Sequence, residues 1–290
     1  MKTLISTDTS CMVQNDALKK YNISVFPLNV IIDGEEYLDG VTITQPELYE
    51  AMRAGTSIKT STPPLGEIIE YFNKLFSDGY EHIIHFTISS KLSSMNSLFN
   101  KVAEEHFKGK LTVIDSYCLS SVMLSYVFYA YDEAEKGTSP ADIATAIEKM
   151  KDKNYLVFVP ENLNALKNGG RISPTIALIG NVIGIKPVIE LKDGALEKDE
   201  MTRKVRLALT DRLTKAFNDM PASDYDYSIV HFFANDVLVD YITNFVNGAI
   251  GEDKAVTGII PINVCAHCGP GTIGIIISPK INGKSLKEFF

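Results

Sequence analysis

Short apolar runs that alternate with amphipathic stretches are the feature that most constrains the fold of this chain. The segment 82–88 is predicted to be a buried strand, and the segment 92–107 carries apolar residues at helical spacing. Another short apolar run follows at 111–114, and a long apolar helix is expected at 119–136. Strands that alternate with helices in this way are typical of α/β proteins with a mainly parallel sheet.

The pattern changes near residue 150. Downstream, the runs 186–191 and 195–200 are joined at Asp193-Gly194 and predict a β-hairpin. A chain of 290 residues is long for one hydrophobic core. We therefore expect an N-terminal three-layer, mainly parallel-sheet domain over residues 1–150 and a C-terminal mixed-sheet α/β domain over residues 151–290. A strand broken by Pro27 is predicted at 24–32, another strand at 255–262, and a short apolar helix at 176–183.

Charge and composition exclude several classes of protein. The formal net charge of -8 argues against nucleic acid as a partner. No apolar run approaches the ~18 residues that span a bilayer, and the N-terminus lacks the apolar stretch of a signal peptide. Four irregularly spaced cysteines form no disulfide framework. The sequence predicts a cytoplasmic protein with reduced thiols.

The segment CAHCGPGTIG at 265–274 contains a C-x-x-C, a histidine and a literal G-x-G-x-x-G. A dinucleotide fingerprint needs a following helix and an acidic residue about 20 positions on, but here an apolar β-branched run follows and the chain ends at Phe290. Cys265, His267 and Cys268 offer three crowded ligands where structural zinc usually takes four. We expect no metal, and we place His267 in a glycine-rich loop, bonded either to an anion or to backbone.

Three polar segments suit an anionic ligand. The segment KTSTPP at 59–64 reads as hydroxyls ahead of a proline-started helix, whose N-terminus would favour a carboxylate or phosphate. Serines at 89–94 follow a predicted strand, where ligands of open α/β sheets bind. In NGGRIS at 168–173, two glycines permit close approach of the backbone and an arginine follows. Plain helix capping and a structural turn remain the alternatives.

In order, these motifs resemble one family. They are KTSxP at 59–63, SSxLS at 89–93, VIDS at 113–116, GGRIS at 169–173, IKP at 185–187 and AHxGPGxxG at 266–274. This set is similar to the DegV family of fatty-acid-binding proteins. The resemblance implies a two-domain fold that buries one long-chain fatty acid between its domains. It also implies no catalysis by this chain, no cofactor, and a partner: the catalytic subunit of a bacterial fatty acid kinase, which phosphorylates the carboxylate.

The resemblance also implies site residues. The carboxylate-binding positions of the family fall on Thr60, Ser61, Ser93, Ser94, Arg171 and His267. The family glycine and threonine that usually follow Leu92-Ser93 are replaced here by Ser94 and Met95. Arg203 matches a family arginine near the carboxylate or the docking face, and we expect the basic group Arg203, Lys204 and Arg206 to meet the kinase. A solvated helix face is the alternative reading of that group.

The acyl chain needs an apolar lining, for which candidates lie on two predicted helices: Met95, Phe99, Ile176, Ile179, Val182 and Ile183. Peripheral membrane contact is expected for ligand exchange. Two alternatives belong to other classes: an acyl-ester hydrolase or transferase with Ser93 as nucleophile, and a metal or redox module at Cys265, His267 and Cys268. The sequence contains no G-x-S-x-G elbow.

Overall fold

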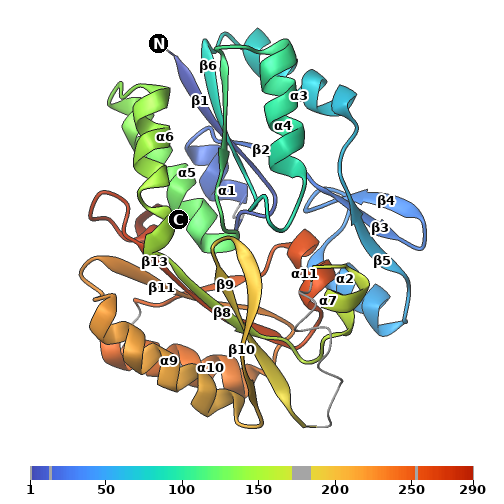
Figure 1. Ribbon diagram of the computed structural model, residues 1–290, viewed down its shortest axis with the longest axis vertical. Helices are drawn as coiled ribbons and strands as arrows, with labels where there is room; N and C mark the ends of the chain where they lie inside the picture. The colour runs from blue at the N-terminus through green and yellow to red at the C-terminus, as the bar shows by residue number, and fades with distance from the viewer. Residues whose placement is uncertain (1, 13–14, 172–183, 252–253, 290) are drawn as a thin grey trace.

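The computed structural model describes residues 2–12, 15–171, 184–251 and 254–289 (Figure 1). A four-stranded parallel sheet of order β2-β1-β6-β7 forms the upper part of the molecule. It contains β1 (Thr3–Asp8), β2 (Ser24–Phe26), β6 (His82–Thr87) and β7 (Leu111–Asp115). All six residues of β6 are buried, as expected for a parallel strand with both faces covered.

Helices cover the two faces of this sheet. On one side lie α3 (Leu65–Ser77) and α4 (Met95–His106), and on the other α5 (Ser120–Glu135) and α6 (Pro140–Glu148) (Figure 1). The short helix α1 (Asn15–Lys20) follows β1. The predicted three-layer, mainly parallel architecture of this half is therefore confirmed.

A three-stranded antiparallel sheet projects from this half. Its order is β4-β3-β5, with β3 (Asn29–Ile32), β4 (Glu35–Leu38) and β5 (Ile58–Ser61), and α2 (Gln45–Arg53) connects β4 to β5. The strand predicted over 24–32 with a break at Pro27 is in fact two strands of different sheets, because the chain leaves the first sheet at Pro27 and enters this one at Asn29. The prediction that Thr60 and Ser61 sit at a helix N-terminus was also wrong: both lie in β5, and α3 begins only at Leu65.

The second half is a six-stranded mixed sheet of order β10-β9-β8-β13-β11-β12. Its strands are β8 (Tyr155–Val159), β9 (Lys186–Lys192), β10 (Ala195–Thr202), β11 (Tyr225–Phe232), β12 (Val256–Ile259) and β13 (Thr272–Pro279). The hairpin β9–β10 is confirmed, with Asp193 and Gly194 at φ 48° and 78° in its turn. Helices α9 (Val205–Asp219) and α10 (Asp236–Ile250) cover the outer face of the sheet (Figure 1).

Two short helices face the upper half: α7 (Asn164–Asn168) and α11 (Ile262–Cys268) (Figure 1). The prediction of a strand over 255–262 was wrong beyond Ile259, because Pro261 precedes the first turn of α11. Short 3-10 turns lie at Lys151–Lys153 and Leu286–Phe289. The predicted helix at 176–183 lies outside the described residues.

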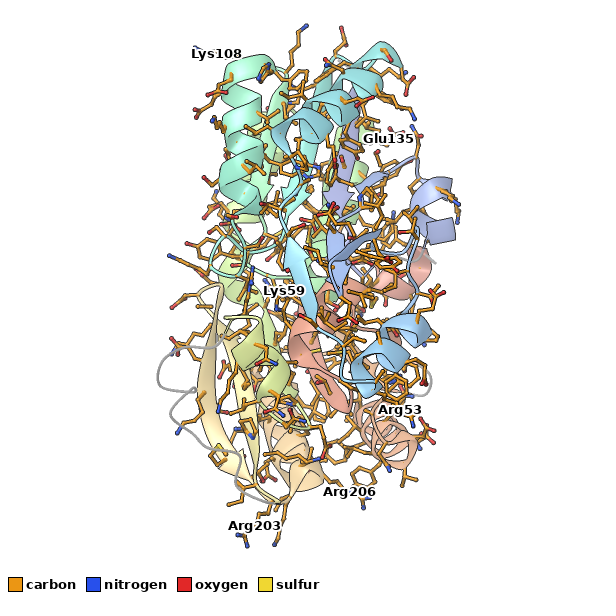
Figure 2. The ribbon with its side chains drawn as sticks, turned by 90° about the vertical axis from the view of Figure 1, so that its right-hand side faces the viewer. Arg53, Lys59, Lys108, Glu135, Arg203 and Arg206 are labelled. Carbon is orange, nitrogen blue, oxygen red and sulfur yellow. The ribbon has the colours of Figure 1, made fainter. Side chains whose placement is uncertain are left out.

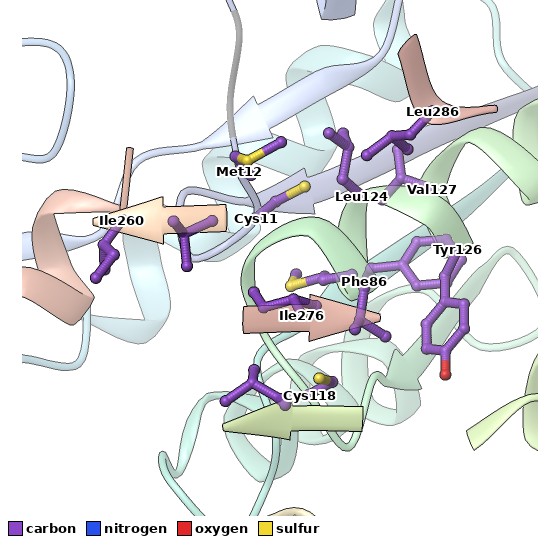
Figure 3. Close-up of a cluster of buried hydrophobic side chains, with 14 of the residues drawn as sticks. Cys11, Met12, Phe86, Cys118, Leu124, Tyr126, Val127, Ile260, Ile276 and Leu286 are labelled. Carbon is purple, nitrogen blue, oxygen red and sulfur yellow. The ribbon is translucent and has the colours of Figure 1, made fainter. Parts of the chain in front are cut away.

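The change of sheet near residue 150 does not divide the hydrophobic core. Helix α5 packs against β1 of the upper sheet and β13 of the lower one. One buried cluster contains Phe86 of β6, Leu124 of α5 and Ile276 of β13 (Figure 3). The boundary at residue 150 stays a prediction. In the described parts of the chain, no helix is both long enough and apolar enough to cross a membrane.

Candidate ligand site

An apolar cavity with one polar end lies where the two halves meet. It holds about 980 Å³ of space between atoms, which includes open solvent at its mouth. Its apolar wall includes Leu28, Ile88, Leu92, Met95, Leu119, Leu156, Phe158, Leu166, Leu196, Val230, Ile260 and Ile276. The predicted site residues Thr60, Ser61, Ser93, Arg171 and His267 also line it. The fold thus brings together five residues from four separate segments of the sequence.

His267 is the most constrained of these residues. It stands near the end of α11, and its Nε2 lies 2.9 Å from the Thr60 hydroxyl of β5. Its Nδ1 is buried and has no hydrogen-bond partner in the described structure. A Cβ at Gly169 would lie only 2.1 Å from that Nδ1. The first glycine of NGGRIS is therefore required because the imidazole occupies the space where a side chain would stand.

Burial and charge set the protonation of His267. Burial, together with the positive charge of Arg171, lowers the pKa of His267 to about 4. The imidazole is neutral at neutral pH, so one ring nitrogen donates and the other accepts. An incoming carboxylate would shift this pKa upward because it favours the imidazolium.

Arg171 connects two of the loops around the cavity. Its Nε donates to the Leu92 carbonyl at 3.2 Å, and its Nη1 donates to the Gly169 carbonyl at 2.6 Å. These two bonds hold the loop after α7 against the serine loop, which we define as residues 88–94. The guanidinium also brings a positive charge to the polar end of the cavity, where it suits an anionic group.

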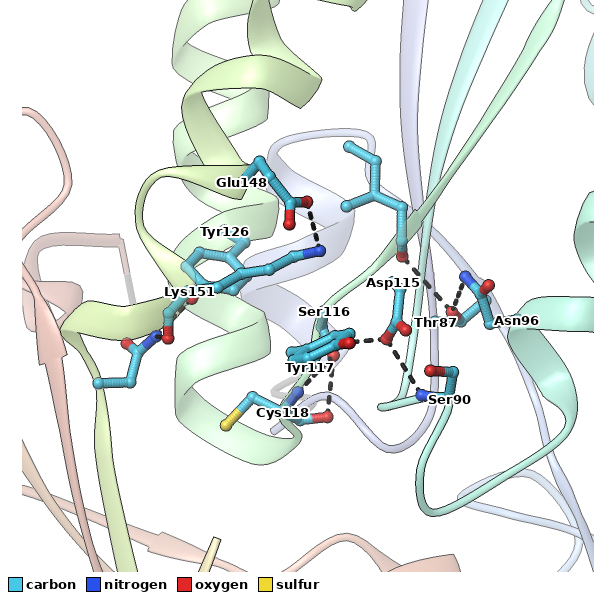
Figure 4. Close-up of polar contacts among 12 residues, drawn as sticks. Thr87, Ser90, Asn96, Asp115, Ser116, Tyr117, Cys118, Tyr126, Glu148 and Lys151 are labelled. Carbon is cyan, nitrogen blue, oxygen red and sulfur yellow. Dashed lines mark hydrogen bonds and ion pairs between the residues drawn. The ribbon is translucent and has the colours of Figure 1, made fainter. Parts of the chain in front are cut away.

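The serine loop is held by its neighbours. Asp115 of β7 accepts hydrogen bonds from the amides of Ser90 and Tyr117 at 3.1 and 3.0 Å (Figure 4). The Ser89 hydroxyl donates to the Gly194 carbonyl in the β9–β10 turn at 2.7 Å. Ser93 is half-buried and lines the cavity, whereas Ser94 is exposed at the N-cap of α4 and does not line it.

Four further polar residues line the cavity, and the sequence analysis named none of them as site residues: Asn29, Ser120, Asn263 and Thr272. Asn29 is 5% exposed, pairs with Ser61 across β3 and β5, and has no partner for its Oδ1 among the described residues. Ser120 is 1% exposed, and its hydroxyl is likewise unpartnered there. Asn29 was hidden inside a run read as one strand, and Ser120 inside a helix read as apolar.

The predicted acyl-chain residues divide into three groups. Met95 lines the cavity. Phe99, one turn further along α4, does not: it stacks on His85 at 4.3 Å and packs in the separate core cluster of the upper sheet. Ile176, Ile179, Val182 and Ile183 lie outside the described residues.

The predicted docking residues lie away from the cavity. Arg203, Lys204 and Arg206 are exposed at the start of α9, and Figure 2 shows Arg203 and Arg206 at the opposite end of the molecule from Lys108. Strand β10 has eight residues and therefore spans about 25 Å between its cavity end at Ala195 and Thr202. Arg206 stacks over Tyr241 at 4.2 Å.

The cysteine motif closes a helix and does not open a loop, which corrects the expected setting of His267. Cys265 lies in the middle of the seven-residue helix α11 and Cys268 is its last residue, and both are buried. Burial, with the neighbouring Cys268 thiol, raises the pKa of Cys265 well above its usual value. A redox C-x-x-C gains its reactivity at a helix N-terminus, which is the opposite end. Among the described residues, no group of three or more His, Cys, Asp or Glu side chains is arranged to hold a metal.

The environment of Ser93 is that of a loop hydroxyl. Its Oγ accepts a hydrogen bond from the Met95 amide at 3.3 Å. The histidine of the cavity is bonded to Thr60 and not to Ser93. A nucleophilic serine requires a base within hydrogen-bond reach, so these contacts give the hydrolase alternative no support.

Comparisons with known proteins agree with this architecture. The sequence model of the DegV family, described as one of uncharacterised proteins, matches residues 2–280. A DegV domain-containing protein of Staphylococcus aureus is 31% identical over 281 residues, covering 96% of this chain and 99% of that protein. A fatty acid binding DegV family protein of Streptococcus agalactiae has a similar structure, with a TM-score of 0.86 and 26% identity over 97% of this chain and 99% of that one. The structure of a DegV family protein of Thermus thermophilus, described by its fatty acid binding, also has a TM-score of 0.86, at 24% identity over 96% of this chain and all of that one. With a family match over nearly its whole length and the same fold in both solved structures, this chain belongs to the DegV family.

Proposed function

We propose that this protein binds one long-chain fatty acid, with the acyl chain in the cavity and the carboxylate at its polar end. The observation that carries the proposal is the joining of two kinds of surface in one cavity: a hydrocarbon wall, and an end that holds Thr60, Ser61, Ser93, Arg171 and His267. A fatty acid presents both an apolar chain and an anionic end, and therefore matches both surfaces.

The energetics favour such a ligand. Each buried methylene contributes about 0.8 kcal/mol, so a sixteen-carbon chain gains on the order of 10 kcal/mol before ordering costs. A carboxylate left without partners would lose much of this gain. Hydroxyls, an imidazole and a guanidinium can pair with it, and charge-assisted hydrogen bonds are the strong ones. The fatty acid binding described for the Streptococcus agalactiae relative supports the same ligand class.

We further propose that the bound carboxylate is presented to a separate fatty acid kinase and that this chain performs no chemistry itself. The exposed basic group Arg203, Lys204 and Arg206 is the proposed docking surface, and complementary charge would speed association with an acidic partner. Binding of the acyl chain and docking of the kinase would then depend on different parts of the molecule.

Ligand titration of delipidated protein with octadecanoic acid tests the binding proposal. His267→Ala and Thr60→Val each remove one partner of the 2.9 Å contact and should weaken binding about tenfold. Thr56→Val is a matched control, because the Thr56 hydroxyl bonds the Ala51 carbonyl and Thr56 does not line the cavity. Unchanged affinity in both cavity variants would remove the head-group assignment. Charge reversal at Arg203, Lys204 and Arg206 should weaken kinase-dependent acyl phosphate formation while Kd for octadecanoic acid stays constant.

A further inference from the structure

Ser120 is a buried polar residue of the cavity wall that does not belong to the proposed head-group set. Ser120 enters from α5, whereas the proposed head-group residues come from β5, α11 and the loops after α7 and β6 (Figure 1). The apolar residues Leu119, Leu156 and Ile276 line the same cavity. Buried hydroxyls nearly always have a partner, so a 1% exposed hydroxyl without one among the described residues needs an explanation.

The backbone around Ser120 adds to the polarity of this point. Ser120 is the first residue of the 16-residue helix α5, and the preceding Leu119 provides no side-chain cap. The Ser120 amide donates to the Ser10 carbonyl at 2.8 Å. The amides that follow have no acceptor within the helix, and they carry the partial positive charge of its N-terminus. A hydroxyl and a helix N-terminus therefore meet at one place on the cavity wall.

The chemistry of this point favours a neutral oxygen. The cationic and imidazole groups that would pair with a carboxylate belong to other segments of the lining, on Arg171 and His267. Ser120 is only 1% exposed, so an ionised group beside its hydroxyl would be desolvated at a high cost. A hydroxyl or oxo group can accept from the helix amides and exchange a hydrogen bond with Ser120 at far lower cost.

We propose that the cavity selects long-chain fatty acids that carry a hydroxyl or oxo substituent along the chain, and that Ser120 with the N-terminus of α5 binds this oxygen. The inference rests on the proposed fatty-acid function and narrows its substrate class. A site built around a substrate oxygen discriminates against the analogue that lacks it, because the buried polar groups are then left unpaired.

The test compares octadecanoic acid with octadecanoic acids that bear one hydroxyl or oxo group at successive positions. In the wild-type protein, at least one substituted acid should bind about fivefold or more tightly than octadecanoic acid itself. If every substituted acid binds equally or more weakly, the inference is overturned, because a trapped water would then suffice to satisfy Ser120. If octadecanoic acid and all its derivatives fail to bind, the proposed function itself fails.

A matched pair of variants assigns the preference to Ser120. Ser120 has φ 59°, which glycine adopts readily, so Ser120→Gly deletes the hydroxyl without straining the backbone. In this variant, the preferred substituted acid and octadecanoic acid should bind with about equal affinity. Ser121→Ala removes a neighbouring buried hydroxyl that is also unpartnered in the described structure but does not line the cavity, and it should keep the wild-type ratio. A preference that persists in Ser120→Gly would refute the assignment.

Discussion

Substitution of Gly169 by alanine offers a sharp test of how His267 is positioned. At most sites with helical dihedrals, Gly→Ala stabilises a protein by about 0.4–1 kcal/mol, because it restricts the unfolded chain. Gly169 has φ -76° and ψ -11°, so its backbone would accept alanine. In this protein the substitution should destabilise the fold instead, because the new methyl would lie 2.1 Å from His267 Nδ1 and 3.1 Å from the Ala165 carbonyl oxygen.

The displacement can be worked out from these distances. Ordinary contact begins near 3.4 Å, so the imidazole would have to move by about 1.3 Å from its 2.1 Å position. A push on Nδ1 drives the far side of the ring toward Thr60, whose hydroxyl is already 2.9 Å from Nε2. The ring must therefore swing aside, which breaks the hydrogen bond and removes a head-group partner. We expect stability to fall by about 1–3 kcal/mol and affinity for octadecanoic acid to fall by about ten- to a hundredfold.

The assay is fatty acid titration combined with urea unfolding of the ligand-free protein. Gly170→Ala is the control: Gly170 has φ +68° and no atom within 4 Å of a built Cβ. It should cost about 1–2 kcal/mol of stability through backbone strain, with little effect on affinity. If Gly169→Ala binds octadecanoic acid as tightly as the wild type, then the position of His267 does not matter to the ligand and the reasoning fails.

Three other predictions concern the surroundings of the cavity. Asp39 accepts from the Asn263 amide at the start of α11, and its burial, reinforced by the charge of Asp8, raises the pKa of Asp39 to about 7. The folded protein keeps the Asp39 carboxyl protonated above its unfolded pKa near 3.8, so the free energy of unfolding falls as pH rises from about 4 to 7. In chemical denaturation, the stability of Asp39→Asn relative to the wild type should increase by roughly 1–3 kcal/mol between pH 5 and 8. A stability difference that does not change with pH would contradict this assignment. All four cysteines are buried, and burial raises the pKa of Cys118 to about 12. A thiol reagent should therefore modify no cysteine in the native protein and all four in urea. Rapid labelling of the native protein would contradict this packing. Phe99→Ala should lower the free energy of unfolding by about 3–5 kcal/mol and leave Kd for octadecanoic acid nearly unchanged. Met95→Ala should change both the stability and the Kd, because Met95 lines the cavity. A large change in Kd for Phe99→Ala would instead place Phe99 at the ligand.

The sequence was sufficient for the architecture because periodicity is a local signal. The predicted strand at 82–88 and the Asp193-Gly194 turn each depend on a few neighbouring residues, and both predictions are confirmed. The errors arose where tertiary context decides. Pro27 divides an apolar run between two sheets, and β5 pairs with β3 although its hydroxyl-rich sequence resembles a helix cap.

The site was harder to predict because its contacts are non-local. Thr60 and His267 are 207 positions apart, and the short motifs alone do not show that they touch. The role of Gly169 follows only from the space that His267 fills. Asn29 and Ser120 belong to no recognisable sequence motif. They stand out because each has a buried polar atom without a hydrogen-bond partner among the described residues, which only a structure can show.

Identification of the ligand released from denatured protein tests the central claim most directly. The protein, purified from cells without detergent, is extracted with organic solvent and the extract is analysed by mass spectrometry against a protein concentration standard. The account predicts about one long-chain fatty acid per chain, with a reduced amount in His267→Ala. Protein that is folded by circular dichroism yet releases no acyl chain, and takes up none when incubated with octadecanoic acid, would contradict it.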